Sequence, residues 1–172
     1  MSAPRLAGPA SAGPFFDLLA RGVGLVSGAG LVALVLLVCT ESFLRGLANI
    51  SLGFAEELTG YLVVMLTFFG AALALRSGSL FQVHFLFERL SGPVRAFVAR
   101  LFMLFALVVC ALLAWKCYDL MASSLARGKF APTVLRTPLW IPQMLMPLGF
   151  GLICLFLIEQ LLLVSRSAKE TK

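Results

Sequence analysis

Residues 22–40 read GVGLVSGAGLVALVLLVCT, a run of 19 residues without a charge. A bilayer core about 30 Å thick needs roughly 20 helical residues at about 1.5 Å each, so this run is long enough to cross a membrane. The whole chain has the same character, because 60% of its 172 residues are hydrophobic and only 13% are charged. Soluble domains average about 25% charged residues. The composition therefore excludes a soluble enzyme and predicts an integral membrane protein.

Charged residues divide the remaining chain into three further apolar runs. These runs are 18, 15 and 22 residues long and cover residues 58–75, 101–115 and 137–158. The run of 15 is short, but the flanking Arg100 and Lys116 can snorkel outward and lengthen its helix. We therefore predict an all-α integral membrane protein. Its four transmembrane helices are expected within residues 21–165, between a mobile tail at residues 1–20 and a second tail at residues 166–172.

The distribution of basic residues predicts the orientation. Nine of the 14 Lys and Arg residues fall in the two tails and the second loop, and five fall in the first and third loops. Because cytoplasmic loops are enriched in Lys and Arg, both termini are expected to be cytoplasmic. The basic residues form no continuous face, so topology and lipid head groups account for the net charge of +6 without a nucleic-acid partner.

A cleaved signal peptide is the alternative interpretation of residues 22–40. The apolar region of a signal peptide is normally about 7–15 residues long and is followed by a small-x-small cleavage site. This run has 19 residues, and Leu36-Leu37-Val38-Cys39 lacks the small residue that a lipoprotein site needs before its Cys. A retained helix is therefore favoured.

Residues 80–90 (LFQVHFLFERL), between the second and third spans, are too short and too polar to cross the membrane. Their mixture of apolar and charged side chains predicts a short amphipathic segment in the plane of the head groups. The alternation at residues 81–85 also suits a strand. Ser91-Gly92-Pro93 then indicates the start of the third helix, which we expect to continue well past Trp115.

Small residues and prolines predict where helices approach closely. Gly24 and Gly28 have the GxxxG spacing of close helix contacts in lipid, although glycine is also simply frequent in membrane helices. A second small-residue surface follows at Gly70 to Ala74. Pro147 and Gly149 predict a kink or a close contact in the last helix.

Four cysteines invite comparison with a quinone-linked membrane thiol oxidoreductase. Such an enzyme needs thiols that are paired in sequence and lie outside the bilayer. The chain has no CxxC, and Cys39, Cys110 and Cys154 lie in or at the ends of apolar runs. Buried small residues are the favoured account. The single histidine, His84, has no partners at metal-ligand spacing, so no catalytic residue, cofactor or metal site is predicted.

Charged residues at the helix ends are more informative. Glu56 and Glu57 open the second helix and Arg76 closes it, where each charge suits the helix dipole. Neighbouring Glu56 and Glu57 point in different directions, so at least one can face a partner. Glu159 is either a functional acid in the membrane or a carboxylate that snorkels to pair with Arg166, and both readings stay open.

Two groups of motifs carry a family resemblance. The first comprises Glu56-Glu57-Leu58, Tyr61-Leu62 and the Gly-Ala-rich stretch from Phe69 to Arg76; the second comprises Thr137-Pro138-Leu139-Trp140 and Pro147-Leu148-Gly149-Phe150. In this order they resemble the DctQ-type small membrane subunit of tripartite ATP-independent periplasmic (TRAP) transporters, over about residues 25–164. The chain departs from that pattern at Gly60, where an Arg is common. It also departs at Leu80 and His84, where the family has His and Asp, so the role of that pair is not carried over.

The resemblance implies a three-part importer in the bacterial inner membrane. A periplasmic solute-binding protein captures an organic anion, a dicarboxylate or another carboxylate, and a large polytopic membrane subunit moves it with the sodium gradient. The small subunit is then a scaffold for the large one and helps to dock the binding protein. Its expected partners are these two proteins and membrane lipids. Candidate contact residues are Glu56, Glu57 and Arg76, with Trp140 and Pro147 shaping the last helix.

Two other functions remain as alternatives. A quinone-linked thiol oxidoreductase would depend on its cysteines and lose activity when all four are replaced. A self-assembling channel or small exporter would form homo-oligomers and conduct ions in bilayers.

Overall fold

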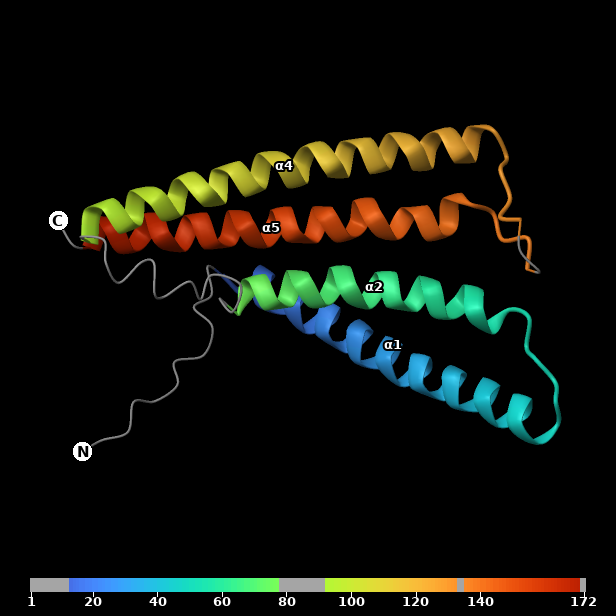
Figure 1. Cartoon of the computed structure of the whole chain (residues 1–172). Helices are drawn as coiled ribbons and strands as arrows, with labels where there is room; N and C mark the ends of the chain where they lie inside the picture. Colours follow the sequence, from blue (N-terminus) through green and yellow to red (C-terminus); the bar gives the residue numbers. More distant parts are fainter. Residues whose placement is uncertain (1–12, 78–91, 133–134, 171–172) are drawn as a thin grey trace, which may run out of the picture.

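The computed structural model describes residues 13–77, 92–132 and 135–170. Its helices are α1 (Pro14–Leu47), α2 (Ala55–Arg76), α4 (Gly92–Ala126) and α5 (Trp140–Glu170), as Figure 1 shows. Each contains a stretch that is long and apolar enough to cross a membrane. The prediction of four transmembrane helices is therefore confirmed. The predicted amphipathic segment at residues 80–90, with His84, lies outside the described residues.

α1 is longer than the uncharged run that predicted it. It begins at Pro14, a residue well suited to the first turn of a helix, so residues 14–20 are helical although we expected them in the tail. At its other end α1 continues past Glu41. This carboxylate accepts hydrogen bonds from Ser51 Oγ and the Leu52 N–H, each at 2.9 Å. Arg21 and Glu41, the charged residues on either side of the apolar run 22–40, therefore lie inside the helix. This is possible because a helix can continue into the polar head-group layer.

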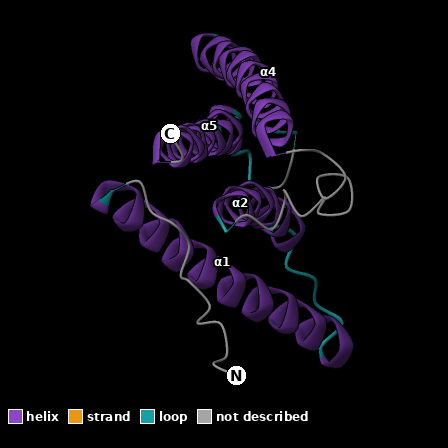
Figure 2. Cartoon of the chain, turned by 90° about the vertical axis from the view of Figure 1, so that its left-hand side faces the viewer, coloured by secondary structure: helices purple, strands orange, loops and turns teal. Residues whose placement is uncertain are grey.

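The helices lie side by side in an order that differs from the chain order. α2 packs against α1 on one side and α5 on the other, and α4 packs against α5. Figures 1 and 2 show α1 crossing α2 obliquely and diverging from it toward the 48–54 loop. We call the end where α1 and α4 begin and α2 and α5 finish the termini end. The opposite end, with the loops at residues 48–54 and 127–139, is the loop end.

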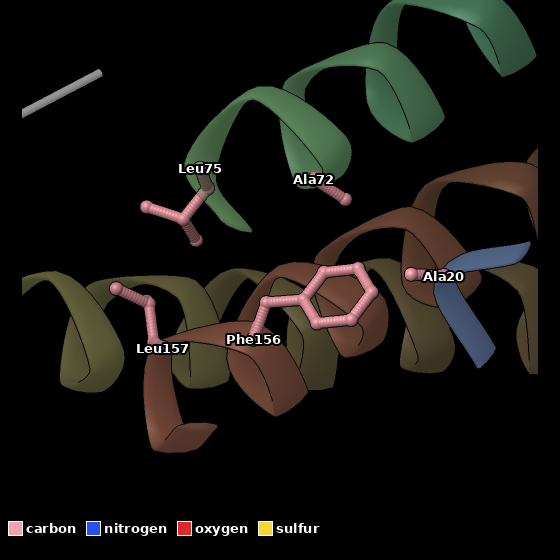
Figure 3. Close-up of a cluster of buried hydrophobic side chains, with 5 residues drawn as sticks. All are labelled: Ala20, Ala72, Leu75, Phe156 and Leu157. Atoms are coloured by element: carbon pink, nitrogen blue, oxygen red, sulfur yellow. The ribbon is translucent and has the colours of Figure 1, made fainter. Parts of the chain in front are cut away.

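The hydrophobic core is small and lies at the termini end. Figure 3 shows its members, which come from α1, α2 and α5: Ala20, Ala72, Leu75, Phe156 and Leu157. Large apolar side chains elsewhere face outward, for example Leu25 on α1 and Trp115 on α4, which are 76% and 73% exposed. In a bilayer such faces contact lipid or another membrane protein and need no burial within the chain.

Two glycines bring helices into close contact. A Cβ at Gly149 of α5 would lie 2.5 Å from Cβ and Cγ of Phe68 on α2, which confirms the close contact that we predicted there. Gly30 of α1 lies against Met65 of α2. Gly24 and Gly28, the predicted GxxxG pair, have open space around them instead. A partner surface at that pair stays a prediction.

Candidate functional site

A buried ion pair joins α2 to α5 at the termini end. Arg76, the last residue of α2, donates a hydrogen bond from Nε to Glu159 Oε2 at 2.9 Å and a second from Nη2 to Glu159 Oε1 at 3.2 Å. The Arg76 side chain is 9% exposed and that of Glu159 is fully buried. Two parallel bonds between a guanidinium and a carboxylate fix both their distance and their relative orientation.

The same guanidinium reaches a third helix. Arg76 Nη2 donates a hydrogen bond to Asp17 in the first turns of α1. The Arg76 Cζ lies 5.8 Å from the centre of the Phe156 ring, within reach of a cation–π contact. Gln160 Nε2 donates to the Arg76 carbonyl oxygen at 3.1 Å and so satisfies a backbone acceptor at the end of α2. We call Asp17, Arg76 and Glu159 the ion-pair cluster.

A second polar cluster ties the start of α2 to the α4–α5 loop at the loop end. Glu57 Oε1 accepts hydrogen bonds from the hydroxyls of Tyr61 and Thr137. The two hydroxyl oxygens lie 3.0 Å apart. Tyr61 is one helical turn after Glu57, whereas Thr137 is 80 residues away in the chain. Glu57 therefore holds a distant loop against its own helix.

Short backbone bridges hold Thr137 in place. The Ala131 N–H donates to the Thr137 carbonyl and the Leu139 N–H donates to the Lys129 carbonyl, each at 2.9 Å. Arg136, next to Thr137, has a φ of 47°, which is uncommon for a residue with a side chain. These contacts hold the described part of the 127–139 loop in one shape across the loop end.

The predicted contact residues do not form one site. Glu57 and Arg76 stand at opposite ends of α2, about 29 Å apart at about 1.5 Å per residue, and both bond to other parts of this chain. Glu56 is exposed in the first turn of α2, so the two acids do point in different directions. Trp140 is the first residue of α5, and α5 continues through Pro147; both side chains are half-buried.

The ion-pair cluster was largely missed by sequence reasoning. Glu159 bonds to Arg76, which we had considered as a helix-end charge and a candidate partner contact. The side chain of Arg166, the partner suggested for Glu159, lies outside the described ones. Asp17 was not singled out because Arg21 was taken as the boundary of the span. The available signal was that ionisable groups in membrane helices tend to pair with one another.

The four cysteines are free thiols distributed over three helices. Cys39 is exposed on α1, whereas Cys110 and Cys117 of α4 and Cys154 of α5 are half-buried. Cys110 packs against the hydrophobic core.

Comparison with known proteins gives one family match. Residues 34–167 match the family described as tripartite ATP-independent periplasmic transporters, DctQ component. That range covers more than three quarters of the chain. It includes the second part of α1, from residue 34 on, all of α2, and the apolar spans of α4 and α5. No curated protein sequence matches the chain.

Proposed function

Because this chain belongs to the DctQ family, the small membrane component of TRAP transporters, we propose that it is a fixed scaffold for the large membrane subunit. As a member of that family it is a multi-pass component of the inner membrane, with four helices suited to spanning it. The scaffold role is supported by α2, which bonds to neighbouring parts of the chain at both of its ends. A helix held at both ends resists tilting and sliding when a neighbouring protein moves.

The outward apolar faces of the chain support a role beside a larger membrane protein. α1 touches only α2 extensively, and its surface around Gly24 and Gly28 is open. Small residues on a membrane helix allow another helix to approach closely. We therefore expect the large subunit to cover part of α1.

The transported solute is proposed from the family resemblance. We propose an organic anion, a dicarboxylate or another carboxylate, that a periplasmic binding protein captures and the large subunit imports with the sodium gradient. The small subunit helps to dock that binding protein. In this arrangement the exposed Glu56 is available for direct contact, whereas Glu57 and Arg76 act by positioning α2, and Trp140 and Pro147 by shaping α5.

Docking requires the loop end to face the periplasm, which we propose on the basis of the Lys and Arg distribution. Fusion of green fluorescent protein or alkaline phosphatase to the C-terminus tests this orientation. With a cytoplasmic C-terminus the fluorescent fusion is bright and the phosphatase fusion is inactive. The reverse result would contradict the proposed orientation.

The scaffold role is tested by purification and reconstitution. An affinity tag on this chain should retain the large subunit, and liposomes containing both subunits and the binding protein should take up a labelled carboxylate in a sodium gradient. Liposomes without this chain should take up little. Sodium-driven uptake by this chain alone would contradict the proposal.

A further inference from the structure

The 127–139 loop carries an unusual concentration of positive charge. Arg127, Lys129 and Arg136 are all exposed, and the sequence contains no Asp or Glu between Asp119 and Glu159. None of these three cations forms an ion pair within the part of the chain that the structure describes. The other connection at this end has a different charge balance, because Arg45 in the last turn of α1 is followed by Glu56 and Glu57 in the first turn of α2.

The cytoplasmic enrichment of Lys and Arg, which accounts for most of the basic residues of this chain, does not extend to these three. In the proposed orientation the loop faces the periplasm, whereas Lys and Arg are normally concentrated on the cytoplasmic side. The loop therefore carries its basic residues against the prevailing bias. A specific acidic partner would account for them.

The loop also has the features of a prepared protein-binding surface. Phe130 and Leu135 are 63% and 49% exposed and lie among the three cations along the loop. Aromatic and arginine side chains are the residues most enriched at interface hot spots. The backbone bridges at Lys129 and Ala131, with the Thr137–Glu57 bond, tie the two described parts of the loop to each other and to α2. A surface that is ordered before binding loses less conformational entropy when it binds.

We propose that residues 127–132 and 135–139, the described parts of the 127–139 loop, are the docking element for the periplasmic binding protein and contact an acidic face of that protein. Arg127, Lys129 and Arg136 attract the acidic face, and Phe130 provides the apolar contact. This inference rests on the proposed function and adds the surface and its chemistry. A lipid surface is the less favoured partner, because a lipid contact does not require the backbone bridges that hold the described parts of the loop.

The test measures binding of the purified binding protein to the complex of the two membrane subunits in nanodiscs, at low and high salt. The triple variant Arg127→Glu, Lys129→Glu and Arg136→Glu should bind at least about tenfold more weakly at low salt, chiefly through slower association. The difference should shrink at high salt, because salt screens exposed charges. Phe130→Ala should speed dissociation at both salt concentrations.

Two further variants separate charge from structure. Arg136→Gly removes one charge and accepts the positive φ without strain, so it should fold normally and still weaken association. Arg45→Glu reverses an exposed cation in the last turn of α1, at the same end of the molecule, and should leave binding within about twofold of the wild type.

The possible results of these binding measurements distinguish the inference from its alternatives. Wild-type binding by the triple variant would overturn the inference, and so would an equal loss in Arg45→Glu, because the effect would then reflect the net charge of the whole face. Loss of association with anionic vesicles, with unchanged protein binding, would make the loop a lipid contact and also overturn it. If the wild-type subunits do not assemble or do not bind the binding protein, the proposed function fails instead.

Discussion

Arg76 and Glu159, which are 83 residues apart in the chain, form a two-bond ion pair at 2.9 and 3.2 Å between the end of α2 and the second half of α5. Both side chains are buried, and the same guanidinium also bonds to Asp17 of α1. One cation thus holds three helices at the termini end. Breaking a buried ion pair leaves the remaining charge poorly compensated, which is strongly destabilising.

Replacing Arg76 should therefore reduce stability sharply. We expect Arg76→Met to cost about 3–5 kcal/mol, and Arg76→Lys to cost less, because lysine keeps the charge but cannot form the two parallel bonds. Thermal unfolding of the purified chain in detergent measures the loss. Arg21→Met, which removes an exposed cation of α1, is the control and should change stability little. An unchanged unfolding temperature for Arg76→Met would contradict the role of the cluster.

The two acids of the cluster should differ in importance. The Asp17 side chain is 44% exposed, whereas that of Glu159 is fully buried. We expect Asp17→Asn to cost at most about 1 kcal/mol, as exposed ion pairs do, and Glu159→Gln to cost distinctly more. The order of the two unfolding temperatures checks this, and a larger loss for Asp17→Asn would show that α1 depends on the cluster more than burial suggests.

Glu57 and Thr137, in the polar cluster at the loop end, should be energetically coupled. We expect the losses from Glu57→Gln and Thr137→Val to be non-additive, with a coupling of about 0.6 kcal/mol and at most about 1.7 kcal/mol, the mean and the maximum found for hydrogen bonds between membrane helices. A double-mutant cycle measured by unfolding in denaturing detergent provides the number. Glu56→Gln with Thr137→Val is the matched control cycle, since Glu56 is exposed beside Glu57, and its coupling should be close to zero.

Gly149 should be the least replaceable glycine of α5. Its substitution by Ala would place Cβ against Cβ and Cγ of Phe68 at 2.5 Å, atoms near the backbone that cannot easily move. We expect a loss of about 1–3 kcal/mol. Gly151→Ala is the control, because that position has open space. Gly30→Ala should cost less than Gly149→Ala, because the new methyl would be too close to the flexible end of Met65 while its contact with Leu66 is of ordinary van der Waals length. Equal stability of the Gly149 and Gly151 variants would show that α2 and α5 do not depend on this contact.

Replacing the four cysteines should separate transport from thiol chemistry. We expect a chain with Ala at Cys39, Cys110, Cys117 and Cys154 to support solute uptake close to the wild-type level, because a scaffold uses these residues only for packing. Uptake by the reconstituted transporter measures this. Loss of uptake by a variant that still assembles with the large subunit would favour the thiol oxidoreductase alternative.

Part of the candidate site was accessible from the sequence. Glu56 and Glu57 at the start of α2 and Arg76 at its end were predicted from charges that flank an apolar run, and the helix has those ends. The Glu57–Tyr61 bond is also local, since residues four apart share a helix face. Asp17 was not predicted as part of the site, because Arg21, the charged residue that precedes the apolar run 22–40, was taken as the start of the helix.

The number and apolar character of the spans were decided by the sequence alone, because a fixed bilayer thickness sets how long an uncharged run must be to cross the membrane. The partners of the polar residues were decided by the tertiary structure. Glu57 bonds to Thr137 and Arg76 to Glu159 because α2 lies beside α5, although α4 comes between them in the chain. A hydropathy pattern shows which segments can cross the membrane and which residues are polar. It does not show which helices are neighbours, because helix neighbours depend on contacts such as that of Gly149 with Phe68.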